Sequence, residues 1–332
     1  MTKNTSKTLF LFMLMLSTML VMSSNNWLSM WMGLEMNMMA FIPMIMKSKN
    51  NFSSESSMMY FLIQSMGSMI LLLTVSTNSL IMMSPVMMNE SAMTLMTISL
   101  LIKMGIAPFH MWMPEIMEKM NWNSCLLLMT WQKLAPMFIM TNIIKENQWI
   151  TINMMMSTVM GAIGGMNQTS LRKILAYSSI SHSSWMLACM KFESYTWIMY
   201  FMVYSTITAM LTMTFNKKSM FYINQMNNMT NTTSEKMLMM TTMLSMGGMP
   251  PFMGFIPKWL AIQSMINANM IMTMTVMILS NMITLFYYLR MITPMMLMSS
   301  ITNKWTQKKS SPMTSMMMLN LTLPTVLALT LN

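Results

Sequence analysis

The 332-residue chain is 55% hydrophobic and only 8% charged, with a formal net charge of +11. Soluble domains carry about 25% charged residues, so this composition indicates a membrane protein with several spans and leaves no room for a sizeable soluble domain. The basic residues lie between apolar runs and do not cluster on a soluble face, which argues against nucleic-acid binding.

Apolar runs of about 20 residues recur along the chain, and runs of this length form membrane-spanning helices. The predicted fold class is all-α, a polytopic membrane protein whose single membrane domain covers residues 1–332. We interpret the first run as a retained helix, because no convincing small-residue cleavage site for a signal peptide follows it. About eleven helices are predicted, over residues 8–23, 27–46, 58–83, 91–113, 125–144, 149–166, 174–190, 195–215, 237–262, 271–289 and 313–331. Segments 216–236, rich in Asn and Thr, and 290–312, rich in Lys and Ser, are predicted surface loops.

Basic residues are distributed unequally between the two sides that this span count defines. The N-terminal side carries the loop lysines and arginines from Lys3 to Lys309, apart from Lys145 and Lys191, which fall on the opposite side. Loops rich in Lys and Arg stay in the inner compartment. The N-terminus is therefore predicted on the inner side and the C-terminus on the outer side.

Methionine is unusually frequent, with 65 copies spread through every predicted span. Its side chain acts there as a flexible apolar filler. Several animal mitochondrial codes read an isoleucine codon as methionine, so the excess indicates a chain that is made in mitochondria.

Four charged residues lie inside long apolar runs, namely Glu35, Lys103, Lys133 and Lys258. A charge at the centre of a bilayer costs at least about 2.5–3.5 kcal/mol and is retained mainly along an ion or proton path. A buried Glu–Lys pair that only fixes helix packing is the structural alternative. There is only one carboxylate for three lysines, however, so at least two lysines have no acidic partner. A change in a neighbouring charge then shifts the pKa of such a lysine, which favours a proton route.

Two predicted helices contain the same kind of interruption, Gly105-Ile-Ala-Pro-Phe109 and Gly248-Met-Pro-Pro-Phe252. Proline has no N–H, so Pro108 leaves the carbonyl of Met104 without its helical partner. Pro250 and Pro251 likewise free the carbonyls of Met246 and Gly247, which other groups must then satisfy. Paired broken helices in two halves of a membrane protein indicate a transport path, although two packing kinks remain an alternative.

The two histidines lie on different predicted spans. His182 lies in the most hydroxylated span, where it could shuttle a proton or hold a water chain; a helix-contact histidine is an equal alternative. His110 is predicted to be an interfacial or hinge residue. Cys125 and Cys189 are isolated, so we predict no disulfide, zinc site or iron–sulfur cluster. No nucleotide-binding glycine motif is present, and Gly161-Ala-Ile-Gly-Gly165 is predicted to pack helices.

Several phrases together resemble one protein family. They are Trp31-Met-Gly-Leu-Glu-Met-Asn37, Lys103-Met-Gly-Ile-Ala-Pro-Phe-His110, Trp131-Gln-Lys-Leu-Ala-Pro136, the run from Asn167 to His182, and the run from Ser245 to Trp259. In this order they resemble the antiporter-like membrane-arm subunits of NADH:ubiquinone oxidoreductase, respiratory complex I, in the animal mitochondrial form. The segment after about residue 290 matches only in hydropathy.

The resemblance implies two inverted five-helix repeats, about 1–144 and 149–292, with one broken helix in each and a C-terminal helix at about 313–331. It also implies three helices fewer at the N-terminus than in bacterial relatives. Carried over by motif, Glu35 and Lys103 form an ion pair, Lys133 connects two half-channels, and Lys258 acts near the second break. His182 corresponds to a polar position on the central hydrophilic axis.

The implied function is proton translocation coupled to NADH oxidation and ubiquinone reduction, in the mitochondrial inner membrane with the N-terminus in the matrix and the C-terminus toward the intermembrane space. This chain would hold no redox cofactor, since NADH, FMN, iron–sulfur clusters and ubiquinone bind partner subunits. The implied partners are other membrane-arm and accessory subunits and phospholipids such as cardiolipin. A cation/proton antiporter subunit and a structural membrane-arm scaffold are the alternative functions.

Overall fold

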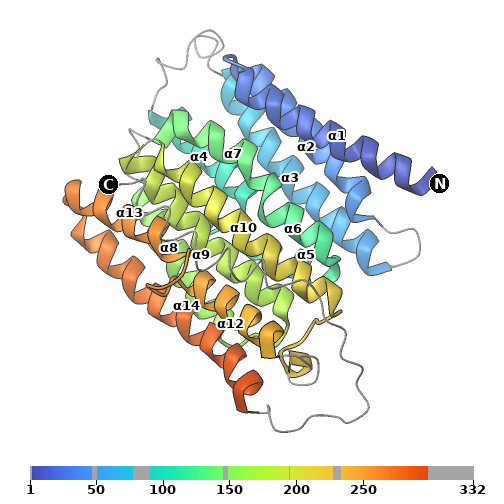
Figure 1. Cartoon of the computed structure of the whole chain (residues 1–332). Helices are drawn as coiled ribbons and strands as arrows, with labels where there is room; N and C mark the ends of the chain where they lie inside the picture. The colour runs from blue at the N-terminus through green and yellow to red at the C-terminus, as the bar shows by residue number, and fades with distance from the viewer. Residues whose placement is uncertain are drawn as a thin grey trace. The chain divides into compact units, whose positions relative to one another are not determined.

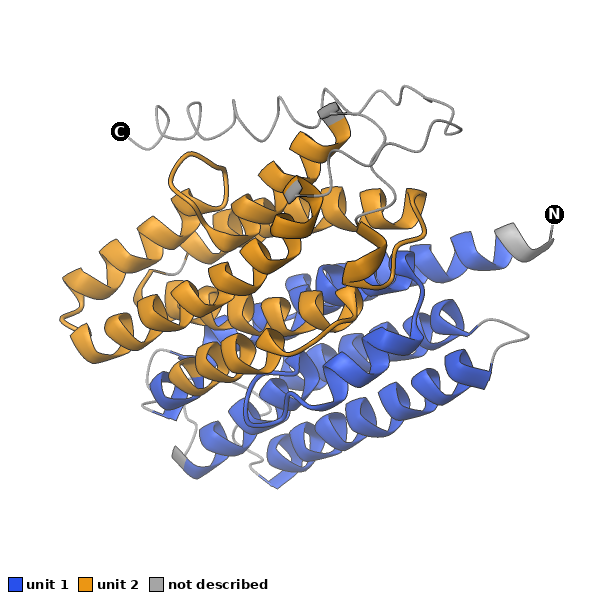
Figure 2. Ribbon diagram, turned by 90° about the horizontal axis from the view of Figure 1, so that it is seen from below, with its two compact units in different colours: residues 1–153 blue, residues 154–332 orange. Residues whose placement is uncertain are grey.

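In the computed structural model, the described residues are 2–46, 51–77, 90–144, 149–193, 195–226 and 233–297. Within these ranges the regular structure is helical, apart from one isolated antiparallel bridge between Ser170 and Tyr222. The chain divides into two compact units, residues 1–153 and 154–332, which Figure 2 shows in different colours. We describe each unit by itself.

The first unit consists of long helices followed by short ones (Figure 1). α2 packs against both α1 and α3, and α4 packs against α3 and α7. These contacts gather the polar residues of α2, α3, α4 and α7 in the interior of the unit. The helix bounds are α1 Thr2–Ser23, α2 Trp27–Ile45, α3 Asn51–Thr77, α4 Glu90–Met104, α5 Trp112–Lys119, α6 Trp122–Met129 and α7 Trp131–Ile143.

The second unit is built around α9, which is buried along almost its whole length. α10 and α13 pack against α9, and α12 and α13 both pack against α10 and α14. The bounds are α8 Trp149–Met166, which begins just before this unit, α9 Leu171–Phe192, α10 Thr196–Lys217, the 3₁₀ helix η2 Ile223–Gln225, α12 Thr233–Gly247, α13 Phe255–Asn267 and α14 Ile271–Leu297.

Five of the described helices are long and apolar enough to cross a membrane. They contain Thr5–Ser23, Trp27–Ile45, Asn51–Thr77, Thr196–Lys217 and Ile271–Met296. On α14, Met272, Leu279 and Phe286 recur every seven residues and are all exposed, which gives this helix an apolar face suited to lipid. α9 differs because its serines face protein, where polar side chains find partners.

The all-helical membrane class is confirmed, but several predicted boundaries are wrong. The predicted helices 91–113, 125–144 and 237–262 are each two helices, α4 with α5, α6 with α7, and α12 with α13. The break at Thr130 was not foreseen, since no glycine or proline lies there. The Thr130 hydroxyl donates to the carbonyl of Leu126 at 2.7 Å, as threonines in the unbroken α10 and α12 do, so this bond does not by itself explain the break.

The predicted loops also differ from the structure. α14 continues through Arg290 to Leu297, so the loop predicted at 290–312 is wrong for its first eight residues. The guanidinium of Arg290 donates to the carbonyls of Met166 and Gln168 at the C-terminal end of α8, which satisfies groups that the helix leaves free. Segment 216–236 contains η2, and the predicted helix 313–331 lies outside the described residues.

Candidate functional site

The first broken helix ends in a glycine turn. α4 stops at Met104, and Gly105 takes the left-handed conformation with φ of 68°. The N–H of Ile106 donates to the carbonyl of Leu101 at 3.1 Å, and the N–H of Gly105 donates to that of Ile102 at 3.2 Å. This pair of bonds is the Schellman motif, which closes a helix where only glycine fits easily.

The second broken helix ends in the same way. α12 stops at Gly247, Gly248 has φ of 78°, and the N–H of Met249 donates to the carbonyl of Leu244 at 3.3 Å. Phe252 then donates to Met249 at 3.0 Å, as Phe109 donates to Ile106 at 2.9 Å. Both helices therefore end in the same glycine motif, and in the turn that follows, the Ala107–Pro108 bond of the first break is cis.

Lys103 lies in the last turn of α4, directly before the first break, and is only 7% exposed. Glu35 on α2 is half-buried and interacts electrostatically with Lys103. Among the described residues no salt bridge within 4.0 Å joins the two side chains. The structure therefore places the carboxylate near the lysine without a salt bridge between them.

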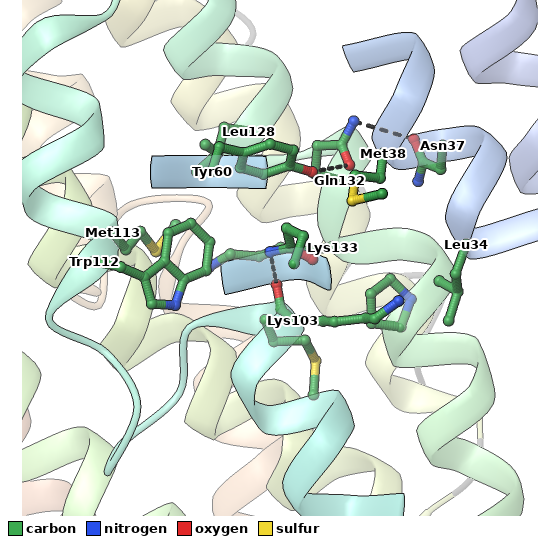
Figure 3. Close-up of a pocket in the computed structure, with 13 residues that line it drawn as sticks. Leu34, Asn37, Met38, Tyr60, Lys103, Trp112, Met113, Leu128, Gln132 and Lys133 are labelled. Atoms are coloured by element: carbon green, nitrogen blue, oxygen red, sulfur yellow. Dashed lines mark hydrogen bonds between the residues drawn. The ribbon is translucent and has the colours of Figure 1, made fainter. Parts of the chain in front are cut away.

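Lys133 on α7 is 2% exposed and lines the same cavity as Lys103 (Figure 3). The cavity leaves about 20 Å³ for the centres of water molecules, which is enough for one water. Its polar lining comes from four helices, through Asn37, Tyr60, Gln64, Lys103, Gln132 and Lys133, and its apolar lining includes Leu34, Met38, Trp112 and Leu128.

A chain of neutral polar side chains crosses one end of this cavity. The amide of Gln132 donates from Nε2 to Oδ1 of Asn37 at 3.1 Å and accepts at Oε1 from the hydroxyl of Tyr60, also at 3.1 Å (Figure 3). Gln64 donates from Nε2 to the backbone carbonyl of Lys103 at 3.1 Å. Sequence reasoning assigned no role to these residues, although Tyr60 and Gln64 are four apart, as expected for one helix face.

Lys258 lies in the first turn of α13, after the second break, and is 4% exposed. Its Nζ donates to the carbonyl of Gly247 at 3.1 Å and to that of Met246 at 3.5 Å. These are the two carbonyls that the paired prolines deprive of helical partners. Its third acceptor is Oδ1 of Asn281 on α14, a residue that sequence reasoning did not single out.

His182 lies near the middle of α9 and is 7% exposed. Its Nδ1 is 2.8 Å from the hydroxyl of Tyr200, and its ring lies 5.0 Å from that of Tyr204. Tyr287 and Tyr288 on α14 are buried close together, with ring centres 4.7 Å apart. The sequence analysis gave these tyrosines no role, because the local sequence does not show which helix face points into the protein.

Three further residues were considered in the sequence analysis, namely His110, Cys125 and Cys189. His110 is buried in the turn between α4 and α5, and its carbonyl accepts from the N–H of Met113 at 3.1 Å. Cys125 and Cys189 are buried free cysteines. Within the described part of the chain, no three His, Cys, Asp or Glu residues are grouped as a metal site would require.

Comparison with known proteins identifies the family. The family model described as NADH:quinone oxidoreductase/Mrp antiporter, transmembrane, matches residues 24–284. NADH-ubiquinone oxidoreductase chain 2 of Locusta migratoria is 43% identical over 311 residues, covering 92% of this chain and 90% of the relative. The chain belongs to the NADH-ubiquinone oxidoreductase chain 2 family. The Anopheles gambiae member is 39% identical, covering 93% of this chain and 91% of its own length.

The chain 2 family also has a recognisable fold. A chain of respiratory complex I from Thermus thermophilus, solved with bound aureothin, superposes with a TM-score of 0.85 at 18% identity, covering 96% of this chain and 77% of that one. This likeness shows an antiporter-like fold. The matched range 24–284 contains both broken helices, the four charged candidates and His182.

Proposed function

We propose that this chain translocates protons across the mitochondrial inner membrane as a membrane-arm subunit of respiratory complex I. One observation carries the proposal: Lys103 and Lys133 are both buried, yet both line a cavity with room for water. Water beside a buried lysine gives its proton somewhere to go, because a water molecule both accepts and donates hydrogen bonds.

In the first unit, Glu35 supplies the charge that biases Lys103. An opposite charge nearby favours the protonated lysine, whereas burial disfavours it. A change in the Glu35–Lys103 separation therefore alters how firmly Lys103 holds its proton. Because Lys103 and Lys133 line one cavity, a change of charge on Lys103 also alters the proton affinity of Lys133.

In the second unit, Lys258 is the proton-carrying group and His182 is a candidate shuttle. Lys258 donates to the freed carbonyls of the broken helix, so its charge and the shape of that break are coupled. His182 contacts the hydroxyl of Tyr200, and imidazole can both accept and donate a proton.

We further propose the assembly and orientation that the resemblance implies. NADH, FMN, iron–sulfur clusters and ubiquinone bind partner subunits, and this chain contributes only proton transfer. The two repeats are inverted, the N-terminus lies in the matrix, and the C-terminus lies toward the intermembrane space. Other membrane-arm subunits and phospholipids such as cardiolipin cover the exposed apolar faces. On a native gel stained for NADH dehydrogenase activity, peptides of this chain should peak in the large active band; a small inactive band would favour a separate cation/proton antiporter.

The proposal is tested by Lys103→Met in complex I reconstituted into vesicles. We expect an assembled complex that moves fewer protons for each NADH oxidised, because methionine fills the same space and carries no proton. Lys7→Met removes an exposed lysine from α1 and serves as the matched control. An unchanged proton-to-NADH ratio in Lys103→Met would contradict the proposed role.

A further inference from the structure

The oxygen atoms around Lys258 match one protonation state of its side chain. A lysine ammonium has three N–H donors and no acceptor, and Nζ of Lys258 has three oxygen acceptors. They are the carbonyls of Met246 and Gly247 and Oδ1 of Asn281. The charged form therefore has as many oxygens within 3.5 Å of Nζ as it has N–H donors.

This site offers a lysine ammonium three neutral oxygens and, among the described residues, no carboxylate within salt-bridge distance. Within the described ranges, no salt bridge involves Lys258. The two carbonyls belong to the C-terminal end of α12, where the helix dipole adds partial negative charge. Neutral oxygens hold an ammonium less firmly than a carboxylate does, so the site suits a lysine that must release its proton again.

The neutral lysine does not fit the same three oxygens. An amine that has lost a proton keeps two N–H donors and gains a lone pair, which repels any oxygen that faces it. The two backbone carbonyls are fixed by the turn at Gly248. Asn281 can adapt, because a half-turn of its amide replaces Oδ1 with the Nδ2 donor.

Thr284 lies where its hydroxyl can form a hydrogen bond with the Asn281 amide in either orientation. Its hydroxyl lies one helical turn from Asn281 on α14, donates to the backbone carbonyl of Asn281 at 2.8 Å and lies 3.2 Å from Oδ1. A hydroxyl oxygen also accepts hydrogen bonds. It can therefore donate to Oδ1 in one orientation and accept from Nδ2 in the other.

We propose that Asn281 is a positioning residue whose side-chain amide turns with the protonation of Lys258, presenting Oδ1 to the ammonium and Nδ2 to the neutral amine. The inference rests on the proposed function, since it concerns how a proton-carrying Lys258 is held and released. It gives Asn281 a role beyond tethering α14 to α13.

The decisive variant is Asn281→Asp in reconstituted complex I. Aspartate has the shape of asparagine and accepts from both Lys258 and Thr284, so a simple tether would be kept or strengthened. An ionised carboxylate cannot donate to a neutral amine, and it holds the ammonium firmly. We therefore expect an assembled complex that has lost proton translocation through this site. Asn267→Asp adds the same charge at an exposed position on α13 and should match the unchanged chain.

Two further variants complete the test. Asn281→Gln keeps an amide and should retain part of the translocation, whereas Asn281→Leu has neither donor nor acceptor and should lose it. If Asn281→Asp fails to assemble, Asn281→Leu carries the test. An unchanged proton-to-NADH ratio in the assembled Asp or Leu variant would overturn the inference. Lys258→Met distinguishes failure of this inference from failure of the proposed function. An unchanged proton-to-NADH ratio in Lys258→Met would reject the proposed role of Lys258 itself.

Discussion

The two broken helices end in the same glycine motif, but their lysines lie in different surroundings. Lys103 precedes its break and lies on the helix that the glycine terminates, whereas Lys258 follows its break and reaches back to the carbonyls of the preceding helix. Lys103 lies near the carboxylate of Glu35, whereas Lys258 donates to three neutral oxygens. The same kind of helix end thus gives two buried lysines different surroundings.

The difference extends to the surroundings of each lysine. Lys103 shares a cavity with Lys133, and that cavity has room for a water molecule. Lys258 donates to three protein oxygens, two of them fixed by the helix break. The first arrangement suits exchange of a proton through water, and the second suits a lysine whose release depends on a side chain that moves.

The largest expected effect comes from Gly254→Ala, which tests whether the second break requires its close backbone contact. A Cβ at Gly254 would lie 1.8 Å from the carbonyl oxygen of Ser245, so α12 and α13 would have to separate. Overpacking of this severity costs about 3 kcal/mol or more, and we expect loss of assembled complex on a native gel. At Gly247 the nearest atom to a new Cβ is 3.6 Å away, so Gly247→Ala should assemble; equal behaviour of the two would refute this account.

Alanine substitutions at Gly105 and Gly248, the two glycines with positive φ, compare the two breaks directly. Gly105→Ala and Gly248→Ala both force a side chain into a conformation that costs about 1–2 kcal/mol, so both should lower the temperature at which the complex dissociates. Only at Gly248 does the new Cβ lie within 2.9 Å of Lys258 Nζ; at Gly105 it meets Trp112 at 3.1 Å. The proton-to-NADH ratio should therefore fall further in Gly248→Ala, and a larger fall in Gly105→Ala would reverse the comparison.

A smaller effect is expected from Glu35→Gln, which removes the carboxylate that distinguishes the first unit. Glutamine keeps the size of the side chain, so we expect normal assembly. Proton translocation should decrease because the electrostatic interaction with Lys103 is lost. The measurement is the proton-to-NADH ratio in vesicles, and a ratio equal to that of the unchanged chain would favour a purely structural scaffold.

The smallest effect is expected from Tyr60→Phe at the edge of the cavity. It removes the hydrogen bond to Oε1 of Gln132, and a neutral hydrogen bond of this kind contributes about 0.5–1.5 kcal/mol. Thermal dissociation should shift slightly, with little change in proton translocation. A loss as large as that of Glu35→Gln would show that the Asn37–Gln132–Tyr60 chain carries the proton itself.

The sequence could predict features that arise from local chemistry. Proline and glycine mark both breaks, and the carbonyls of Met246 and Gly247 follow from the missing N–H groups of Pro250 and Pro251. Both carbonyls accept from Lys258, which lies twelve residues after Met246 and eleven after Gly247. These predictions succeed because a missing donor has the same consequence in any tertiary structure.

Other features depend on packing that the local sequence does not show. Asn281 lies 23 residues from Lys258 on another helix, and its single amide in an apolar helix carries no positional signal. The break at Thr130 lies at a threonine, a residue that most helices tolerate, and it carries no local sequence signal. α14 extends through Arg290, whose guanidinium donates to backbone carbonyls at the end of α8, a helix far away in the sequence.

The central claim is that Lys258, a buried lysine with no salt bridge among the described residues, carries a proton in the second unit. The most direct test is the proton-to-NADH ratio of complex I assembled with Lys258→Met, measured in vesicles beside the exposed-site control Lys217→Met. We predict that both complexes assemble and that the ratio falls only in Lys258→Met. A ratio for Lys258→Met equal to that of the control would contradict the claim.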